Sequence, residues 1–186
     1  SGRPGPVLID ITKDAFIKEA EYTGKGKSRV VKNESHLPLG EIVDVINAAN
    51  KPMIFTGGGV VLSGAEDELY TFAKKIGAPV AQSLMGKSSY PSSDELSTGM
   101  VGMHGSKASN MAFTHCDLLI VCGARFSDRV TGNPKEFAQH AKIIQIDIDP
   151  AEINKNIATT LHATGDIKDI LSKLNAAVPE KDHHEW

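Results

Sequence analysis

Short apolar runs alternate with amphipathic stretches from residue 38 onward. The runs at residues 53–56, 79–83, 118–121 and 142–148 are rich in aliphatic residues and predict strands. Because the run 118–121 is apolar throughout, we expect a strand that is covered on both faces. Between these runs, apolar residues at helical spacing predict helices. This alternation predicts an α/β fold of the Rossmann-like type: a doubly wound, mainly parallel sheet with helices on both faces.

Capping residues predict where several helices begin. Ser63 and Glu66 have the spacing of a capping box, Ser106 and Asp166 can each begin a helix, and Gly77 can end one. A further helix start is expected at Asn133, Pro134 and Glu136. Another is expected at Asp149, Pro150 and Glu152.

The remaining segments have weaker patterns. Residues 7–12 predict a short strand, residues 20–37 an exposed polar linker and residues 88–99 a polar loop. The last seven residues, 180–186, show no periodicity. One compact domain with short irregular ends is therefore expected.

Composition excludes several classes of protein. The chain has 186 residues, 40% hydrophobic and 23% charged, with a formal net charge of -3, which argues against nucleic acid as the main partner. It contains no apolar run of membrane-spanning length, so no membrane partner is expected. Cys116 and Cys122 lack the spacing of a metal site and favour buried free thiols in a reducing compartment, so a cytoplasmic location is expected.

The segment GARFSDRVTG, residues 123–132, directly follows the apolar strand 118–121. A glycine at the carboxyl end of a parallel strand lets a ligand approach the backbone, and Arg125 and Arg129 offer forked donors that match a phosphate. The alternative is a pair of solvated cations that form weak ion pairs, for example with Asp128. We favour a bound nucleotide because ligands of doubly wound folds lie at this end of the strands.

Two other loops are ambiguous by themselves. In TGGGV, Gly57, Gly58 and Gly59 follow a strand, and they are either a plain turn or a backbone cradle for a phosphate at a helix start. In VGMHG, Met103 and His104 lie between two glycines, where a histidine is more often structural than a ligand. Neither loop decides the function alone.

Two aspartates follow predicted strands. Asp147 ends the strand IIQIDID and can accept hydrogen bonds from ribose hydroxyls, whereas Asp149 fits helix capping better. Asp166, in ATGD, is explained equally well as a helix cap. Together with the loops above, they would surround a nucleotide at one edge of the sheet.

These motifs, with GRPGPVLIDITKD at residues 2–14, resemble the catalytic subunit of the acetolactate synthase (acetohydroxyacid synthase) family of thiamine-diphosphate enzymes. The resemblance covers the whole chain but only the middle of the family's polypeptide. It implies that residues 1–37 are the end of a preceding domain and a linker. Residues 38–179 would then be a central FAD-binding domain, and residues 180–186 a tail that leads to a downstream domain.

The resemblance also implies roles for particular residues. Asp128 and Arg129 would face the channel for substrates and inhibitors, and no residue of this chain would be catalytic or bind a metal. Leu84 and Met85 could equally be core residues. The implied contacts of FAD are Arg3, Gly57, Gly58, Gly59, Ser83, Leu84, Met85, Gly102, Met103, His104, Gly123, Ala124, Arg125, Arg129, Asp147, Ile148 and Asp166.

The family condenses two pyruvates, or pyruvate and 2-oxobutyrate, with decarboxylation in branched-chain amino-acid biosynthesis. Thiamine diphosphate and Mg²⁺ would be bound only by parts of the parent protein outside this chain, which by itself should be inactive. The implied partners are further copies, in a dimer or tetramer, and a regulatory subunit. The alternatives are the middle domain of a glyoxylate carboligase or acyl-CoA decarboxylase and, in a different class, a stand-alone nucleotide-binding module.

Overall fold

The computed structural model describes residues 2–22, 24 and 35–186, and its contacts divide the chain into two units, residues 1–33 and 34–186. In the first unit, α1 (Lys13–Ile17) is the only helix of the described residues. The strand predicted at residues 7–12 is not formed. Val7 and Leu8 are 84% and 92% exposed, and a strand needs a neighbour to pair with. Most of the predicted linker at residues 20–37 lies outside the described residues.

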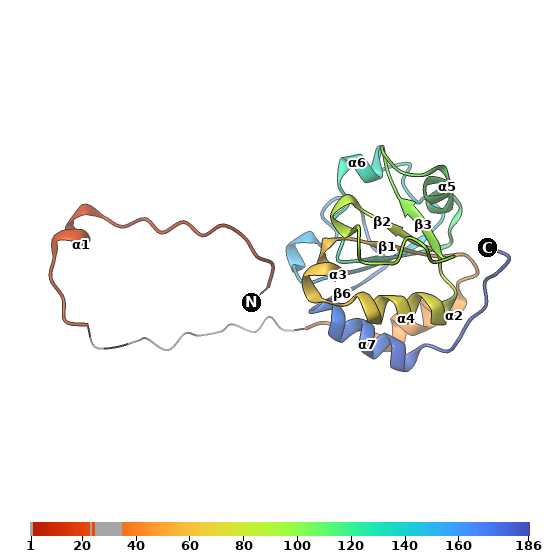
Figure 1. Ribbon diagram of the computed structural model, residues 1–186, viewed down its shortest axis with the longest axis horizontal. Helices are drawn as coiled ribbons and strands as arrows, with labels where there is room; N and C mark the ends of the chain where they lie inside the picture. Colours follow the sequence, from red (N-terminus) through yellow and green to blue (C-terminus); the bar gives the residue numbers. More distant parts are fainter. Residues whose placement is uncertain (1, 23, 25–34) are drawn as a thin grey trace. The chain divides into compact units, whose positions relative to one another are not determined.

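The second unit is built on a six-stranded sheet in which all neighbouring strands are parallel. The strand order is β3-β2-β1-β4-β5-β6, so the predicted doubly wound α/β fold is confirmed (Figure 1). The strands are β1 (Pro52–Thr56), β2 (Val80–Gln82), β3 (Ser97–Met100), β4 (Leu118–Cys122), β5 (Lys142–Asp147) and β6 (Leu161–Thr164).

This order places a topological switch between β1 and β4. From β1 the chain first adds β2 and β3 on one side and then crosses to β4, β5 and β6 on the other. Because all strands are parallel, the loops that leave their carboxyl ends emerge at one edge. In folds of this kind ligands bind in the crevice at that edge, beside the switch point.

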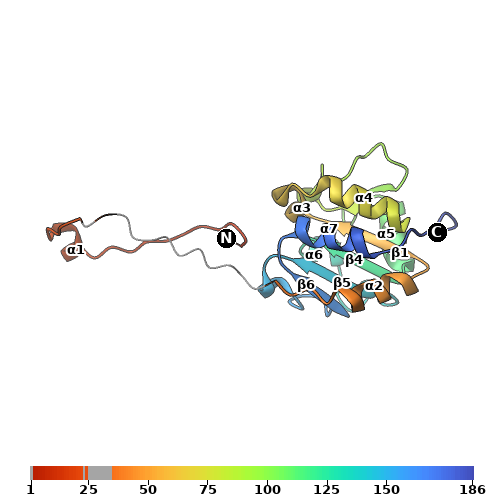
Figure 2. The same ribbon diagram turned by 90° about the horizontal axis from the view of Figure 1, so that it is seen from below.

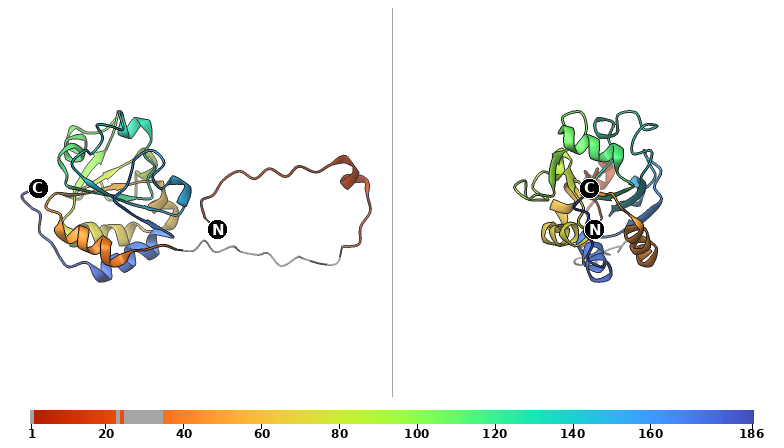
Figure 3. Two further views of the ribbon diagram at one scale, coloured as in Figure 1. Left: turned by 180° about the vertical axis from the view of Figure 1, so that it is seen from behind. Right: turned by 90° about the vertical axis from the view of Figure 1, so that its right-hand side faces the viewer.

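Helices cover both faces of the sheet. Figure 1 shows α2 (Leu39–Ala48), α4 (Glu66–Ile76) and α7 (Ile167–Ala177) on one face, and α5 (Lys107–His115) with α6 (Asp128–Thr131) on the other. Seen from below, α7 runs between α4 and α2 (Figure 2), and the end-on view shows the layers on opposite sides of the sheet (Figure 3).

Side chains alternate between two cores across the sheet. In β4, Ile120 belongs to the core under α2, α4 and α7, whereas Leu119 and Val121 belong to the core under α5. All five residues of β4 are buried. The sequence pattern of an apolar strand covered on both faces is therefore confirmed.

Several predicted helix ends are confirmed. Gly77 ends α4 in the left-handed conformation, with φ of 59°, and the Ser106 hydroxyl accepts from the Ser109 amide at the start of α5. Asp149 caps a short turn, η2 (Pro150–Glu152), by accepting from the Ala151 amide. This turn is a 3₁₀ helix of three residues and not the longer helix that was expected.

Three other expectations are wrong. Ser63 does not begin a helix, because it is the last residue of α3 (Gly58–Ser63), and α4 begins after Ala65. The residues after Asn133 form turns, and a helix occurs instead at α6. Residues 88–99 are not all loop, because Ser97 begins the edge strand β3. Among the described residues, no helix has both the length and the apolar character needed to cross a membrane.

Candidate functional site

The loops after β1 and β4 meet backbone to backbone at the switch point. The Gly57 amide donates to the Cys122 carbonyl and the Gly59 amide to the Gly123 carbonyl, each at 3.0 Å. A Cβ on Gly57 would lie 2.5 Å from Ala124 Cα, and one on Gly59 would lie 2.7 Å from Gly123 Cα. This packing has room only for glycine at both positions.

The glycine packing changes the role expected for this loop. A phosphate cradle needs free amide donors, but those of Gly57 and Gly59 are already bonded within the protein. The two glycines therefore fix the distance between the β1 and β4 loops. They do not supply donors to a phosphate.

Gly58 faces the loop that follows β2. A Cβ on Gly58 would lie 3.2 Å from the Cβ of Met85, in the 3₁₀ turn η1 (Leu84–Gly86). The Ser83 hydroxyl accepts from the Gly86 amide at 3.0 Å and so holds this turn. Leu84 and Met85 are 71% and 77% exposed, so the interpretation that they are core residues is wrong.

The loop after β3 is joined to the segment that carries Arg129. The Met103 amide donates to the Arg129 carbonyl at 2.8 Å, and a Cβ on Gly102 would collide with the same carbonyl oxygen. Asn110, on α5, accepts from the Gly102 amide at 2.9 Å and donates to the Gly102 carbonyl at 3.1 Å. Asn110 could not be predicted from the sequence, because its only signal is an amide side chain eight positions after Gly102. Met103 is 72% exposed and His104 is also exposed.

The two arginines have different surroundings. The Arg125 Nε lies 3.5 Å from a carboxylate oxygen of Glu152, whose side chain is 6% exposed and also pairs with Lys155 at 3.0 Å. Arg129 is exposed in α6, where its amide donates to the Asp128 carboxylate at 2.9 Å. Arg125 therefore pairs with an acid from the loop after β5 and not with Asp128. Sequence analysis considered Glu152 only as part of a helix start.

The end of β5 and the loop after it add Asp147 and Ile148 to the carboxyl edge of the sheet. Asp147 is buried, its carboxylate accepts from the Asp149 amide at 2.9 Å, and its carbonyl accepts from the Gly165 amide at 3.0 Å. Ile148 is half-buried beside it. The Gly123 amide donates to the Ile146 carbonyl at 2.9 Å, which connects this loop to the Gly123 turn.

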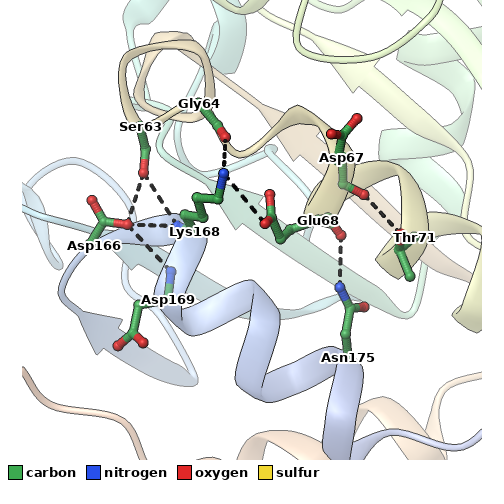
Figure 4. Close-up of polar contacts among 9 residues, drawn as sticks. All are labelled: Ser63, Gly64, Asp67, Glu68, Thr71, Asp166, Lys168, Asp169 and Asn175. Atoms are coloured by element: carbon green, nitrogen blue, oxygen red, sulfur yellow. Dashed lines mark hydrogen bonds and ion pairs between the residues drawn. The ribbon is translucent and has the colours of Figure 1, made fainter.

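Asp166 acts as a structural cap. Its carboxylate accepts from the amides of Lys168 and Asp169 at the start of α7, and from the Ser63 hydroxyl at 2.9 Å (Figure 4). Lys168 donates to the Gly64 carbonyl at 3.0 Å, so α7 is tied to the end of α3. The capping interpretation of Asp166 is confirmed, because one carboxylate oxygen, Oδ1, accepts all three hydrogen bonds.

The structure thus joins most of the expected site residues through direct backbone contacts. One series of contacts runs from Met85 through the triple glycine to Gly123 and Asp147, and another joins Met103 to Arg129. Arg3 belongs to the other unit, whose placement relative to the sheet is not described. Among residues 2–22, 24 and 35–186, no group of three or more His, Cys, Asp or Glu side chains could hold a metal ion.

The all-parallel sheet, its covering helices and the glycine-packed loops at its switch point define a doubly wound α/β domain. The family described as "Thiamine pyrophosphate enzyme, central domain" matches residues 39–174. The chain belongs to this family.

The most similar proteins agree with this assignment. A probable acetolactate synthase large subunit of Methanocaldococcus jannaschii is 45% identical over 100% of this chain and 33% of its own length. The chloroplastic acetolactate synthase of Arabidopsis thaliana is 43% identical over 97% of this chain and 28% of its own length. The chain therefore spans about a third of these relatives.

A solved structure supports the fold. An X-ray structure from Mycobacterium smegmatis, described as that of a thiamin diphosphate-dependent enzyme, has a TM-score of 0.65 and 29% identity. The match covers 77% of this chain and 28% of that protein. The architecture described above is thus shared with part of that protein.

Proposed function

We propose that this chain is the FAD-binding central domain of an enzyme of the acetolactate synthase type. The observation that carries the proposal is the exposed edge of the sheet, where arginine and apolar side chains surround tightly packed glycine loops. Leu84, Met85 and Met103 are each more than 70% exposed, although large apolar side chains are usually buried. A ligand with a large apolar ring would cover them.

The residues at this edge fit the chemistry of a flavin dinucleotide. Arg125 and Arg129 supply permanent positive charge for a diphosphate, and Asp147 supplies carboxylate oxygens for ribose hydroxyls. Leu84, Met85 and Met103 offer the apolar contact that an isoalloxazine ring needs. FAD would serve here as a structural group without net redox change, as the resemblance to the acetolactate synthase family implies.

The proposed activity belongs to the whole parent protein. It is the condensation of two pyruvates, or of pyruvate and 2-oxobutyrate, with decarboxylation, and it depends on thiamine diphosphate and Mg²⁺ bound outside this chain. Because the chain spans only about a third of the related synthases, we infer that the chain alone contributes binding and positioning but no carboligation, which an acetolactate assay would test.

Arg129 has a second proposed role in the parent. It lies beside Asp128 in α6, and both side chains are exposed. A permanent cation at this place would attract anionic 2-oxoacids toward the reaction centre. Arg129→Ala in the intact enzyme should raise the KM for pyruvate and weaken inhibitor binding, and no change in either would refute this role.

The partners and the compartment follow from the same proposal. The relatives are named large subunits, so we propose a dimer or tetramer of the parent with a regulatory subunit. Cys116 and Cys122 are buried free thiols, and burial raises the pKa of each to about 12. Protonated thiols of this kind suit a reducing compartment, and we propose the cytoplasm.

A titration with FAD tests the proposal. Flavin fluorescence is followed for this chain and for the parent protein, each as wild type and as the Arg125→Ala/Arg129→Ala variant. We expect tight binding by the parent, weak binding by the chain, and a loss on the order of tenfold or more in the variant. Lys142→Ala is the matched control, because Lys142 is an exposed cation at the opposite end of β5. Equal affinities of the parent, its double variant and its control would contradict the proposed site.

A further inference from the structure

Residues 181–186, here called the C-terminal tail, lie against the carboxyl ends of two helices. The Lys181 amide donates to the Lys75 carbonyl at 2.8 Å, and its ammonium donates to the Asn47 carbonyl at 2.7 Å. Asn47 lies in the last turn of α2 and Lys75 in the last turn of α4. Carbonyl groups at these positions have no partner within their own helix, and they carry the negative end of the helix dipole.

His183 bridges the two helix ends. Its Nδ1 lies 2.7 Å from the Ile76 carbonyl oxygen, and its Nε2 lies 3.2 Å from the Ala49 carbonyl oxygen. A carbonyl oxygen only accepts hydrogen bonds, whereas a neutral imidazole has a proton on one nitrogen alone. Both contacts are hydrogen bonds only when the ring carries two protons and is therefore positively charged.

The C-terminal tail packs against Gly77. This glycine ends α4 with φ of 59°, and a Cβ there would lie 3.1 Å from the Lys181 carbonyl oxygen and 3.2 Å from the His183 amide nitrogen. The C-terminal tail thus packs directly on the backbone of the helix end. Any larger residue at this position would push both away.

Trp186 holds the end of the tail. Its indole N–H donates to the Pro52 carbonyl at 2.9 Å, at the start of β1, and its ring packs on the core under α5. The Lys51 ammonium lies 5.7 Å from the ring centroid. Since Trp186 is the only tryptophan of the chain, its fluorescence reports on the docking of the tail.

We propose that the C-terminal tail is a latch, and that it closes fully on the helix ends only when His183 carries both ring protons. The latch would fix the direction in which a longer chain leaves the domain. It is independent of the flavin site, because its contacts are with α2, α4 and the start of β1.

Other charged groups around the histidine have partners of their own. The Lys75 ammonium donates to the Asn175 carbonyl at 2.6 Å, and that of Lys181 points to Asn47. Asp182 pairs with the ring of His184 at 3.0 Å, and both side chains are exposed. The His184 amide is the main cause that lowers the pKa of Asp182, which leaves a carboxylate next to His183 in the sequence. The charged groups nearest to His183 along the tail and the end of α4 are therefore the ammonium groups of Lys75 and Lys181 and the carboxylate of Asp182.

The test follows Trp186 emission of this chain from pH 5 to pH 9, with circular dichroism to show that the fold persists. At pH 5 we expect Trp186 to be docked and its emission maximum to be blue-shifted. At pH 9 the equilibrium constant for docking of the tail should be smaller, on the order of tenfold. His183→Gln should abolish this pH dependence. His184→Gln, the matched control, should leave it intact, since that ring is exposed and pairs with Asp182.

Nitrogen NMR of the ring separates protonation from docking alone. The proposal expects two protonated ring nitrogens on His183 while Trp186 is docked. A singly protonated His183 with the tryptophan still fully docked would overturn it. So would a pH dependence that survives in His183→Gln, or a tryptophan that is exposed to solvent at every pH.

Discussion

The backbones of Gly57 and Gly123 pack directly against each other at the carboxyl edge of the sheet. Gly57 donates across the switch point to Cys122, and Gly123 adopts φ of 56° so that its carbonyl can accept from Gly59. The contact holds the β1 and β4 loops at one separation. Of the two arginines that follow Gly123, Arg125 pairs with Glu152 in the loop after β5, and the Arg129 carbonyl accepts from Met103 in the loop after β3.

Alanine substitutions should show that this contact is steric. Gly123→Ala should lower the free energy of unfolding by more than about 2 kcal/mol, because its Cβ would lie 2.8 Å from Gly59 Cα. Gly64 is the control, since it lies in the left-handed region with φ of 61° and has no atom within 4 Å of a Cβ. Gly64→Ala should cost about 1 kcal/mol, from backbone strain alone. Urea denaturation measures both, and equal losses would show that the packing contributes nothing.

Asp166 should behave as a helix cap. Asp166→Ala removes the acceptor of two amides and of the Ser63 hydroxyl, so we expect a loss of about 1 to 2 kcal/mol in unfolding free energy. Asp166→Ser should recover part of it. Asp169→Ala removes only an exposed i,i+4 pair with Lys173 and should cost less than about 0.5 kcal/mol. If Asp166→Ala lowered the affinity for FAD but not the stability, the capping role would be secondary.

The two cysteines should make stability depend on pH in the alkaline range. Burial raises the pKa of Cys116 and of Cys122 from 9.0 to about 12 in the folded protein. The unfolded chain therefore releases these protons first, and stability should fall as the pH rises from about 9 to 12. Cys122→Ala should make this fall shallower. Neither thiol should react with a thiol reagent at pH 8 unless the protein is unfolded, and fast labelling of the native protein would contradict this view.

The exposed apolar residues should matter for binding and not for stability. Leu84→Gln and Met85→Gln change side chains that are more than 70% exposed, so the free energy of unfolding should change by less than about 0.5 kcal/mol. Ile120→Ala, in the buried centre of β4, should cost about 2 to 5 kcal/mol. We expect the first two variants to weaken FAD binding by the parent protein. A large loss of stability in either would place these residues in the core after all.

The strands of the central sheet could be predicted because their apolar runs reflect burial on both faces. The edge strand β3 could not, since Ser97–Met100 pairs on one side only and is half-buried throughout. Residues 7–12 have the composition of a strand, but no strand forms beside them among residues 2–22 and 24. A local sequence pattern alone therefore does not decide whether a strand forms, because the segment also needs neighbouring strands to pair with.

The helix boundaries that were wrong depend on contacts distant in sequence. Ser63 and Glu66 have capping-box spacing, yet the Ser63 hydroxyl bonds to Asp166, 103 positions further on. The three glycines disfavour a helix by propensity, but α3 forms there because Gly59 bonds to the β4 loop. For the same reason, the roles of Asn110 and Glu152 became visible only in three dimensions.

Amide chemical shifts of the isotope-labelled chain, followed as FAD is added, detect even weak binding and locate the site. We expect the signals of residues 57–59, 83–86, 102–104 and 123–129 to move, while those at the amino ends of the strands, such as Lys142, stay unchanged. No shifts up to millimolar FAD, or shifts confined to another face, would contradict the proposed flavin site.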